Sequence, residues 1–293
     1  ISTDLFQGNV NSIAIGPAPK FMKEDTIYCS YDGHYFYENY NDLIEDKKLN
    51  KKPYYNYYQY IPHRTTSYLN NSIYNAYLEQ YGVSDASVLY NQADIFFKMQ
   101  NKYSINASMM YALALNESGL GLSQYAIDYN NLFGHAAIDE NPDNANQYSS
   151  LVDCVQQHAY NFLQQGYLNP NDSRYHGSWF GDKASGINVS YASDPYWGEK
   201  AASFYYHLDE GGIDQEKNPI KTIQLSKDLK VYAPNKKDVL YTYKKGEIVS
   251  IHILKEEIGY YKISSEAPVK DNDLNVNSKY KNSYAYTKKS DFK

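Results

Sequence analysis

The chain is poor in cysteine, with only Cys29 and Cys154 among its 293 residues. Two cysteines cannot form a disulfide framework, and they are too few to support a zinc site. We expect two buried free thiols, although a single bridge stays open as an alternative. The histidines show no metal or catalytic-triad spacing, and Ser178 lacks the glycine context of a nucleophile elbow. We therefore expect no metal, no cofactor and no serine catalysis.

Arginine and long apolar runs are also scarce. Arg64 and Arg174 are the only arginines, so few guanidinium partners exist for buried acids. No run approaches 18 apolar residues, so no membrane span is predicted. Because the chain starts with isoleucine, we expect a processed protein whose export signal lies upstream. The length allows roughly two domains.

Charge is unevenly distributed along the chain. Residues 220–293 contain 15 lysines and 9 acidic residues, a net charge of +6. Residues 1–219 contain 13 basic and 25 acidic residues, a net charge of −12. A basic module on an exported protein indicates an anionic partner such as wall polymers, a membrane surface or nucleic acid. An inert face of solvated lysines is the alternative.

One abundant residue is tyrosine, at 35 positions against 10 phenylalanines and 2 tryptophans. This excess of tyrosine is explained as well by a compositional bias of the genome as by selection for a tyrosine-rich surface. Tyrosines that line a cleft also suit carbohydrates, because the ring packs on a sugar while the hydroxyl forms hydrogen bonds.

The most informative stretch is Ala112–Gly119, which places the carboxylic acid Glu117 at the end of an otherwise apolar helix. The helix is predicted from the cap residue Asn106 to Glu117. Ala114, Leu113 and Met110 lie three, four and seven residues before Glu117, so the acid shares their apolar stripe. Desolvation there should raise its pKa and keep a proton available for general acid catalysis. A structural glutamate paired with an arginine or a backbone donor is the alternative.

The order of predicted elements runs from helices to strands. A hairpin is predicted around the pair Asp32-Gly33. The further helices are predicted at 67–81, 87–102, from 123, at 150–165, and from Asp194 to about 211, with Ser150 and Asp153 as a capping box. Five strands are predicted at 222–225, 230–233, 247–254, 260–264 and 283–288, which together favour a small β-barrel.

Three motifs occur in order within residues 105–208, namely Ala114–Gly121, Asn130–Gly134 and Tyr191–Ala202. Together they resemble the glucosaminidases of glycoside hydrolase family 73, which are cell-wall autolysins with a lysozyme-like fold. The segment Tyr57–Thr65 is similar to the lead-in of clostridial members. The resemblance implies an α+β fold with a lysozyme-like, mainly helical catalytic domain and a small β-lobe.

The resemblance also implies domain limits and partners. The predicted domains are an extended lead-in (1–25), a catalytic domain (26–219, with a hairpin at 26–40 and a helical core at 65–210) and a C-terminal barrel (220–293). The implied activity is hydrolysis of the GlcNAc-β-1,4-MurNAc bond of peptidoglycan by a secreted, monomeric enzyme at the cell wall. Peptidoglycan glycan strands are then the substrate, and no nucleic acid partner is expected.

Site residues follow from matching positions to the family motifs. Glu117 matches the catalytic acid, and Tyr191 matches a tyrosine of the substrate cleft. Phe133 and Asn131, in the Asn-Asn-Leu-Phe-Gly motif, are candidate substrate-binding residues, with core packing under a loop as the other role of Phe133. Trp179 and Trp197 are weighed as sugar platforms against core packing: both roles stay open for Trp179, whereas Trp197 is assigned to the core.

The second carboxylate lies in a lobe that varies within the family. Asp139 is the first candidate for it, Glu140 the second and Asp143 the third, from the segment Ala137–Pro142 and the residue after it. If one of them activates water, the reaction inverts; otherwise the substrate's acetamido group attacks while Tyr191 steadies it. A muramidase, a lytic transglycosylase and a catalytically silent wall-binding protein are the rival interpretations.

The C-terminal region contains three further motifs, Tyr241–Val249, Gly259–Ile263 and Ala285–Phe292. They resemble a bacterial Src-homology-3-like wall-binding module. The usual tryptophan after the distal turn is Tyr260 here, and residues 266–282 resemble a polar insertion. Anionic wall polymers are the expected ligands of this module.

Overall fold

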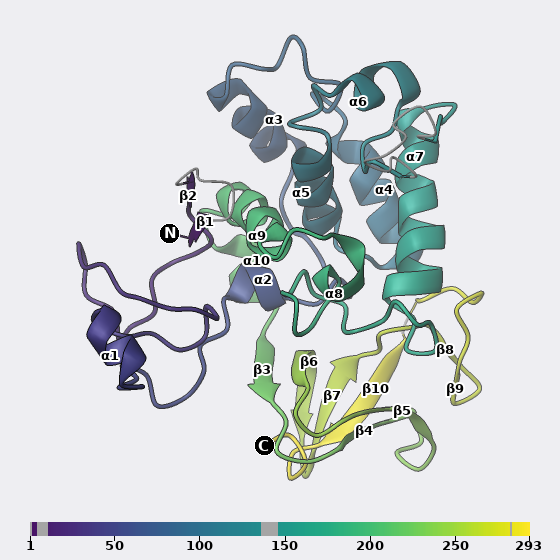
Figure 1. Ribbon diagram of the computed structural model, residues 1–293. Coiled ribbons are helices and arrows are strands. Elements are labelled where there is room, and N and C mark those ends of the chain that lie inside the picture. The colour runs from purple at the N-terminus through teal and green to yellow at the C-terminus, as the bar shows by residue number, and fades with distance from the viewer. Residues whose placement is uncertain (1, 5–10, 136–145, 282) are drawn as a thin grey trace.

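The computed structural model describes residues 2–4, 11–135, 146–281 and 283–293. Figure 1 shows a helical body above a β-sheet, with the N-terminal segment beside them. Helices in the described residues are α1 (Tyr40–Ile44), α2 (Tyr57–Tyr60), α3 (Asn71–Gln80), α4 (Ala93–Tyr103), α5 (Ala107–Glu117), α6 (Gln124–Tyr129), α7 (Leu151–Gln157), the π-helix η2 (His158–Tyr167), α8 (Asn188–Tyr191), α9 (Trp197–Leu208) and α10 (Ile213–Lys217). The α+β class is confirmed.

Helix α5 runs through the middle of the helical body and packs on α4 and α9. Every residue from Ala107 to Leu115 is buried, as expected for a helix that is apolar on all sides. The side chain of Asn106 accepts a hydrogen bond from the backbone N–H of Met109 and caps the helix. The helix predicted at 106–117 is therefore confirmed, and it places Glu117 at the edge of the core.

Other helices match their predicted positions but differ at their starts. Helix α3 begins after the cap residue Asn70 rather than at Ser67, whose hydroxyl instead bonds the buried hydroxyl of Ser108 at 2.5 Å. Helix α4 begins at Ala93, because residues 87–92 form hydrogen-bonded turns. The predicted helix 150–165 is confirmed as α7 and η2, and the hydroxyl of Ser150 accepts from the N–H of Asp153.

The predicted cap Asp194 lies three residues before its helix, because α9 begins at Trp197. Its carboxylate accepts from the N–H of Tyr196 at 2.9 Å and pairs with Lys200 at 2.7 Å. Asp194 therefore orders the turn that leads into α9.

The predicted N-terminal hairpin is wrong. Residues 26–37 form a single β-bridge between Cys29 and Tyr37. The Asp32 carboxylate accepts from the N–H groups of His34 and Tyr35, and these bonds close a loop in place of a strand ladder. In the lead-in, β1 (Ser2–Asp4) pairs with β2 (Asn11–Ile13).

The C-terminal strands form one antiparallel sheet in the order β3-β6-β7-β10-β4-β5. Their bounds are β3 (Ile220–Gln224), β4 (Leu229–Tyr232), β5 (Val239–Tyr243), β6 (Ile248–Glu257), β7 (Tyr260–Ser264) and β10 (Tyr284–Lys288), with a separate pair β8 (Val269–Lys270) and β9 (Asp273–Leu274). Strands β3 and β5 are the two edges of this sheet, so the predicted closed barrel is wrong. Strand β5 was not predicted; it pairs with β4 and extends the sheet by one strand.

The sheet and the helical body share a buried boundary. Tyr60 and Trp179 of the body belong to the hydrophobic cluster that forms the core of the sheet. The guanidinium Nε of Arg64 donates to the backbone oxygen of Glu266 at 2.7 Å, and Gln164 donates to the backbone oxygen of Val276 at 2.7 Å. The sheet core and the segments between β7 and β10 thus both contact the body.

Both cysteines are free, Cys154 buried and Cys29 half-buried. Within the described ranges, no group of three or more histidine, cysteine or acidic side chains could hold a metal ion. In the same part of the chain, no helix is both long and apolar enough to cross a membrane.

Candidate active site

Glu117 is the last residue of α5, and its half-buried carboxyl is held by two donors. The indole Nε1 of Trp197 donates to its Oε1 at 2.6 Å, and the amide of Asn116 donates to the same oxygen at 3.1 Å. Burial raises the pKa of Glu117 because it penalises the charged form, while these two hydrogen bonds act in the opposite direction. Burial outweighs them, so the carboxyl holds its proton to higher pH than an exposed glutamate.

Trp197 is fixed by a close approach between α9 and the preceding loop. A Cβ on Gly198 would lie 1.8 Å from the backbone oxygen of Gly181, so only glycine allows this contact. The Trp197 side chain is 3% exposed, and its ring centroid lies 4.7 Å from that of Tyr191. The core assignment of Trp197 is confirmed, but the indole also donates a hydrogen bond to Glu117, a contact that was not predicted.

Tyr191 ends the short helix α8 and lies beside the same indole. Its hydroxyl donates to the backbone oxygen of Phe133, 3.4 Å away. Burial raises the pKa of Tyr191 well above its ordinary value, so the hydroxyl stays protonated. A neutral tyrosine beside Trp197 can donate its one proton to a ligand in place of the Phe133 oxygen.

Lys183 holds the C-terminal end of α8. Its ammonium group donates to the backbone oxygens of Asn188 at 2.6 Å and of Ala192 at 2.7 Å, with a longer contact to that of Val189 at 3.4 Å. These oxygens lack partners within so short a helix, and a cation at a helix C-terminus is favourable. Lys183 therefore positions the segment that carries Tyr191.

The Asn-Asn-Leu-Phe-Gly segment lies next to the acid. Gly134 has φ +62°, and a Cβ on it would stand 3.9 Å from Oε2 of Glu117. Asn131 shapes this loop: its amide donates to the backbone oxygens of His135 and Asn146, and its oxygen accepts from the N–H of His135. Asn131 is 1% exposed, so its polar atoms form hydrogen bonds within the loop and stabilise its conformation.

Phe133 is 2% exposed and stacks on His158 with ring centroids 3.7 Å apart. His158 in turn bonds His135 through their ring nitrogens at 3.1 Å, and His135 stacks on Phe162 at 3.8 Å. Burial lowers the pKa of His135 to about 3 and that of His158 well below its ordinary value. These rings are neutral packing under the loop, which is the alternative role expected for Phe133.

Trp179 is not an exposed platform. Its ring is fully buried at the boundary with the sheet, and its indole N–H donates to the hydroxyl of Ser185 at 3.0 Å. The candidate second carboxylates Asp139, Glu140 and Asp143 lie outside the described residues. The structure thus brings Glu117, Tyr191 and the backbone of Phe133 together, and adds Trp197 to them.

Another partly buried acid in the body is Glu199, two residues after Trp197. Burial raises its pKa to about 7, and its Oε2 atom has no hydrogen-bond partner among the described residues. It faces the charge of Asp182, which is bound by His34 at 3.1 Å and by the Tyr60 hydroxyl at 2.7 Å. Sequence reasoning missed this acid because its helix also carries polar residues and gives no apolar stripe around it.

Pockets of about 250 and 650 Å³ occur in the described structure, and Glu117 lines neither of them. The candidate site is defined by its chemistry: a half-buried carboxyl with a raised pKa, an indole donor on that carboxyl and a neutral tyrosine beside it. A carboxyl with a raised pKa serves as the general acid in glycoside hydrolases.

Comparison with known proteins agrees with that class. Residues 93–210 match the family model described as mannosyl-glycoprotein endo-beta-N-acetylglucosaminidase. A glucosaminidase domain is therefore present in this part of the chain, and it includes Glu117, Tyr191 and Trp197.

Two Streptococcus pneumoniae proteins named "Putative endo-beta-N-acetylglucosaminidase", from strains TIGR4 and R6, are 38% identical over 130 residues. The match covers 44% of this chain but only 19% and 18% of those two proteins. The chain thus spans about a fifth of the length of these relatives.

Solved structures with partial likeness are autolysins. The structure of S. aureus autolysin E with the disaccharide NAG-NAM aligns with a TM-score of 0.42 at 19% identity. The alignment covers 66% of this chain and 87% of the autolysin E chain. A major bifunctional autolysin gives a TM-score of 0.37 at 25% identity over 52% of this chain and 68% of its own.

Proposed function

We propose that the protein is a peptidoglycan hydrolase that cleaves the GlcNAc-β-1,4-MurNAc bond, with Glu117 as the general acid. The observation that carries the proposal is the half-buried carboxyl of Glu117, with its raised pKa and its hydrogen bond to Trp197. The glucosaminidase match over residues 93–210 supports the bond that is cut. The streptococcal names support the same reaction class.

In the proposed step, the Glu117 carboxyl gives its proton to the glycosidic oxygen, and the bond from C1 of GlcNAc to that oxygen breaks. MurNAc leaves with a hydroxyl group, and a water oxygen joins C1 to give a reducing GlcNAc end. Glu117 becomes a carboxylate as the proton leaves, and the indole N–H at its Oε1 stabilises that charge. A proton from the attacking water restores the acid.

Two routes exist for the attack on C1. In the first, Asp139 or Glu140, with Asp143 as the third candidate, activates the water and the reaction inverts. In the second, the substrate's acetamido group attacks, and the neutral hydroxyl of Tyr191 orients it. Asp139→Asn, Glu140→Gln and their double variant separate the routes: a large fall in rate supports the first, and retained activity together with a loss in Tyr191→Phe supports the second.

The experiment that tests the function is digestion of purified peptidoglycan followed by mass spectrometry of the new reducing ends. We expect reducing GlcNAc. Reducing MurNAc would assign the protein to the muramidases, and anhydro-MurNAc would assign it to the lytic transglycosylases. If the full chain binds peptidoglycan but releases no new reducing ends, the result would favour a catalytically silent wall-binding protein.

We further propose that the protein acts outside the cell as a monomer and that residues 220–293 form a Src-homology-3-like module that binds anionic wall polymers. The module's net charge of +6 supports this, since the body at −12 would be repelled by polyanions. Binding of the full chain to walls should weaken with salt, because exposed charges are screened beyond about 8 Å at physiological ionic strength. Equal retention on walls stripped of anionic polymers would reject the targeting role.

A further inference from the structure

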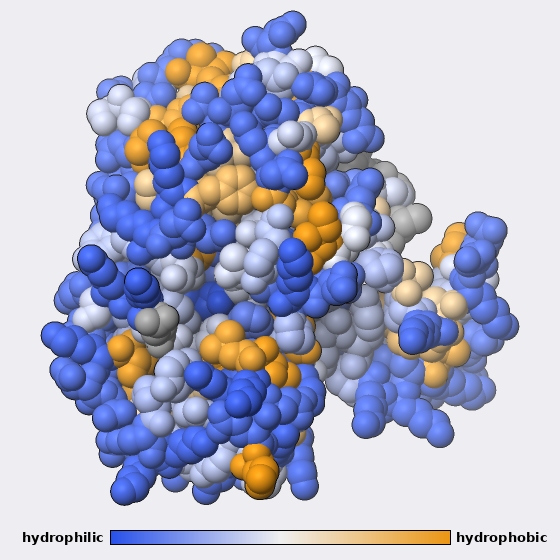
Figure 2. Space-filling view, turned by 180° about the vertical axis from the view of Figure 1, so that it is seen from behind, coloured by the Kyte–Doolittle hydropathy of each residue, from blue (hydrophilic) through white to orange (hydrophobic). Residues whose placement is uncertain are grey.

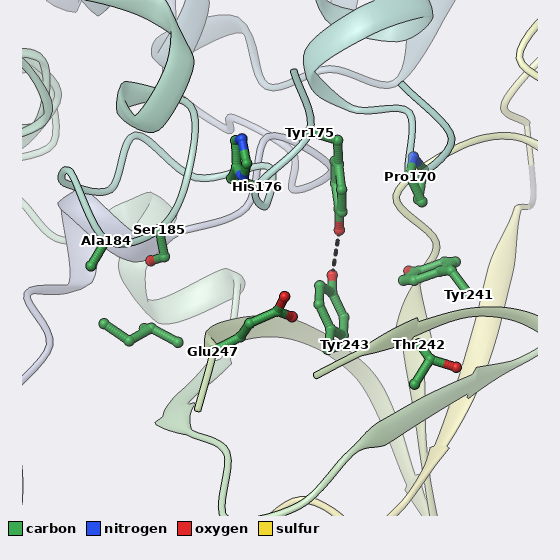
Figure 3. A pocket seen from close by; sticks show the side chains of 10 residues that line it. Pro170, Tyr175, His176, Ala184, Ser185, Tyr241, Thr242, Tyr243 and Glu247 are labelled. Atoms are coloured by element: carbon green, nitrogen blue, oxygen red, sulfur yellow. Dashed lines mark hydrogen bonds between the residues drawn. The ribbon is translucent and has the colours of Figure 1, made fainter. Parts of the chain in front are cut away.

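A separate pocket lies at the boundary between the helical body and the sheet. It has a volume of about 250 Å³ and is lined by the loop after η2 on one side and by β5 and the β5–β6 turn on the other (Figure 3). Its chemistry comes from Tyr175, Tyr241 and Tyr243 together with His176 and Glu247. The proposed glycosidase step uses none of these residues.

The aromatic walls of this boundary pocket are held rigidly across the two regions. The hydroxyl groups of Tyr175, from the body, and Tyr243, from the sheet, are 2.6 Å apart and share a hydrogen bond (Figure 3). The Tyr243 hydroxyl is also 3.2 Å from the buried carboxyl of Glu266, to which it can donate. The ring of Tyr241 stands at 85° to that of Tyr243, with centroids 5.5 Å apart. Together, these contacts form an aromatic corner that needs little reorganisation to bind a ligand.

A carboxylate completes the pocket. Figure 3 shows the Glu247 side chain directed into the space between Ser185 and Tyr243. One of its oxygens accepts from the backbone N–H of Lys244 at 2.7 Å, which fixes the side chain. The ammonium group of Lys244 pairs with Asp228 at 3.0 Å instead of with Glu247. Among the lining residues, Glu247 supplies the formal charge, and it is negative.

Ring faces beside a carboxylate favour an ammonium ligand, because the ring quadrupole and the carboxylate both attract a cation. The same sheet already shows this preference on its surface. Lysine ammonium groups lie 3.7 Å from the Tyr284 ring centroid and 4.2 Å from that of Tyr286. Within the part of the chain that the structure describes, no lysine or arginine is found over the rings of the three pocket tyrosines.

Size and position narrow the ligand further. A volume of about 250 Å³ is below the roughly 300–1,000 Å³ of pockets for drug-sized molecules, so a single side chain fits better than a glycan. Ser185 lines the pocket and Tyr191 lies beside Glu117, six residues further along. Six residues span at most about 20 Å, so the pocket lies within about that distance of Tyr191.

We propose that the boundary pocket binds a primary ammonium group on a short aliphatic stem, as carried by the free amine of a diamino acid in a wall peptide. The ammonium lies against Tyr241 and Tyr243 and pairs with the Glu247 carboxylate. The assignment of the amine to a wall peptide rests on the proposed function. The pocket's preference for an ammonium group is argued from the pocket residues alone.

The test is an NMR titration of the full chain with Nα-acetyl-lysine methylamide, which has a free side-chain amine. Its matched ligand control is the Nε-acetylated form, which has the same stem but no charge. We expect shifts at the pocket residues with the amine and none with the acetylated form. Equal shifts with both ligands, or none with either, would overturn the proposal.

Variants test the pocket residues directly. Glu247→Gln should weaken amine binding about tenfold, and Tyr241→Leu should weaken it by a similar factor. The control variant is Glu256→Gln, which changes an exposed carboxylate on β6, the strand that follows Glu247 in the sequence. It should leave amine binding unchanged. An effect of Glu247→Gln no larger than that of Glu256→Gln would contradict the assignment, with thermal melting used to confirm that each variant is folded.

Titration with choline distinguishes a primary from a quaternary ammonium ligand. If choline binds more tightly than the lysine amine, the pocket prefers a quaternary ligand and the primary-amine assignment is overturned. Weaker binding of choline supports the assignment. Because these titrations use no wall, amine binding without wall hydrolysis would refute the proposed function alone. Hydrolysis without amine binding would refute this inference alone.

Discussion

The helical body and the C-terminal sheet place their ionisable side chains differently. The body holds half-buried acids with raised pKa, such as Glu117 and Glu199, and buried histidines with lowered pKa, such as His63 and His158. The sheet keeps its lysines at the surface, on tyrosine rings and beside carboxylates. Figure 2 shows a largely hydrophilic surface over the sheet at the bottom of the view.

The sheet's exceptions are Glu266, which is 5% exposed and whose pKa burial raises to about 7, and His252, whose pKa burial lowers to about 4. Glu266 is buried where the sheet meets the body, close to Arg64 and Tyr243. Desolvation of charge is therefore a property of the body and of its boundary. Under the proposed function, proton transfer takes place in the body, while the sheet contributes surface charge and one wall of the boundary pocket.

The largest expected effect that tests this division comes from Glu117→Gln. The amide keeps the shape of the side chain but cannot donate an acidic proton, so wall hydrolysis should fall by about 10²- to 10⁴-fold. Glu216→Gln, at an exposed position on α10, is the matched control and should keep full activity. Turnover near the wild-type rate in Glu117→Gln, measured by release of reducing sugar, would remove the acid from the mechanism.

The next effect concerns the indole donor. Trp197→Phe removes the hydrogen bond that stabilises the Glu117 carboxylate, so the rate should fall about 10- to 100-fold, as a hydrogen bond to a charged group is worth about 1.5–3 kcal/mol. The pKa of Glu117 should rise further, which moves the alkaline limb of the pH–rate profile to higher pH.

Trp179→Phe is the control for that change. Trp179 is also a buried tryptophan, but it donates to Ser185. Its pH–rate profile should keep the wild-type limbs. A shift of equal size in both variants would mean that loss of packing, rather than the bond to Glu117, explains the result.

Lys183→Met should have a smaller effect, a loss of about 3- to 10-fold. It leaves the backbone oxygens at the end of α8 without their donor and loosens Tyr191, and a partly exposed charged hydrogen bond is worth about 1 kcal/mol. Steady-state kinetics should show the loss mainly in kcat if Tyr191 acts in the reaction. Lys98→Met, on the exposed face of α4, should behave as wild type.

Glu199→Gln should change stability more than activity. Its pKa of about 7 in the folded protein exceeds the ordinary value of 4.5, so the folded wild type loses stability as pH rises from about 4.5 to 7. The variant lacks this loss and should be more stable by about 1 to 3 kcal/mol at pH 8, but not at pH 4. Urea unfolding at both pH values measures the difference, and a loss of activity as large as that of Glu117→Gln would make Glu199 the acid instead.

Helix α5 and the position of Glu117 were predictable because both depend on local sequence. A cap residue, an apolar run and a terminal glycine pattern determine where the helix begins, what it buries and where the acid lies. The bond from Trp197 was not predictable, since it joins residues 80 positions apart through the packing of α9 on α5.

Local sequence patterns gave wrong predictions where side-chain hydrogen bonds or long-range packing determine the structure. The Asp32-Gly33 pair indicated a hairpin, yet the Asp32 carboxylate binds backbone N–H groups that a strand ladder would have used. Short strands indicated a barrel, but closure depends on the pairing of β3 with β5, which no local pattern encodes. Trp179, weighed as a sugar platform in a glycine- and serine-rich loop, is buried because the sheet covers it.

The most direct test of the central claim is an NMR titration of the Glu117 carboxyl carbon in the full chain, assigned with Glu117→Gln. We expect it to titrate above the ordinary value of 4.5, with the alkaline limb of the pH–rate profile at the same pH. A carboxyl that titrates at or below 4.5 would be ionised at neutral pH, and it would contradict the assignment of Glu117 as the acid.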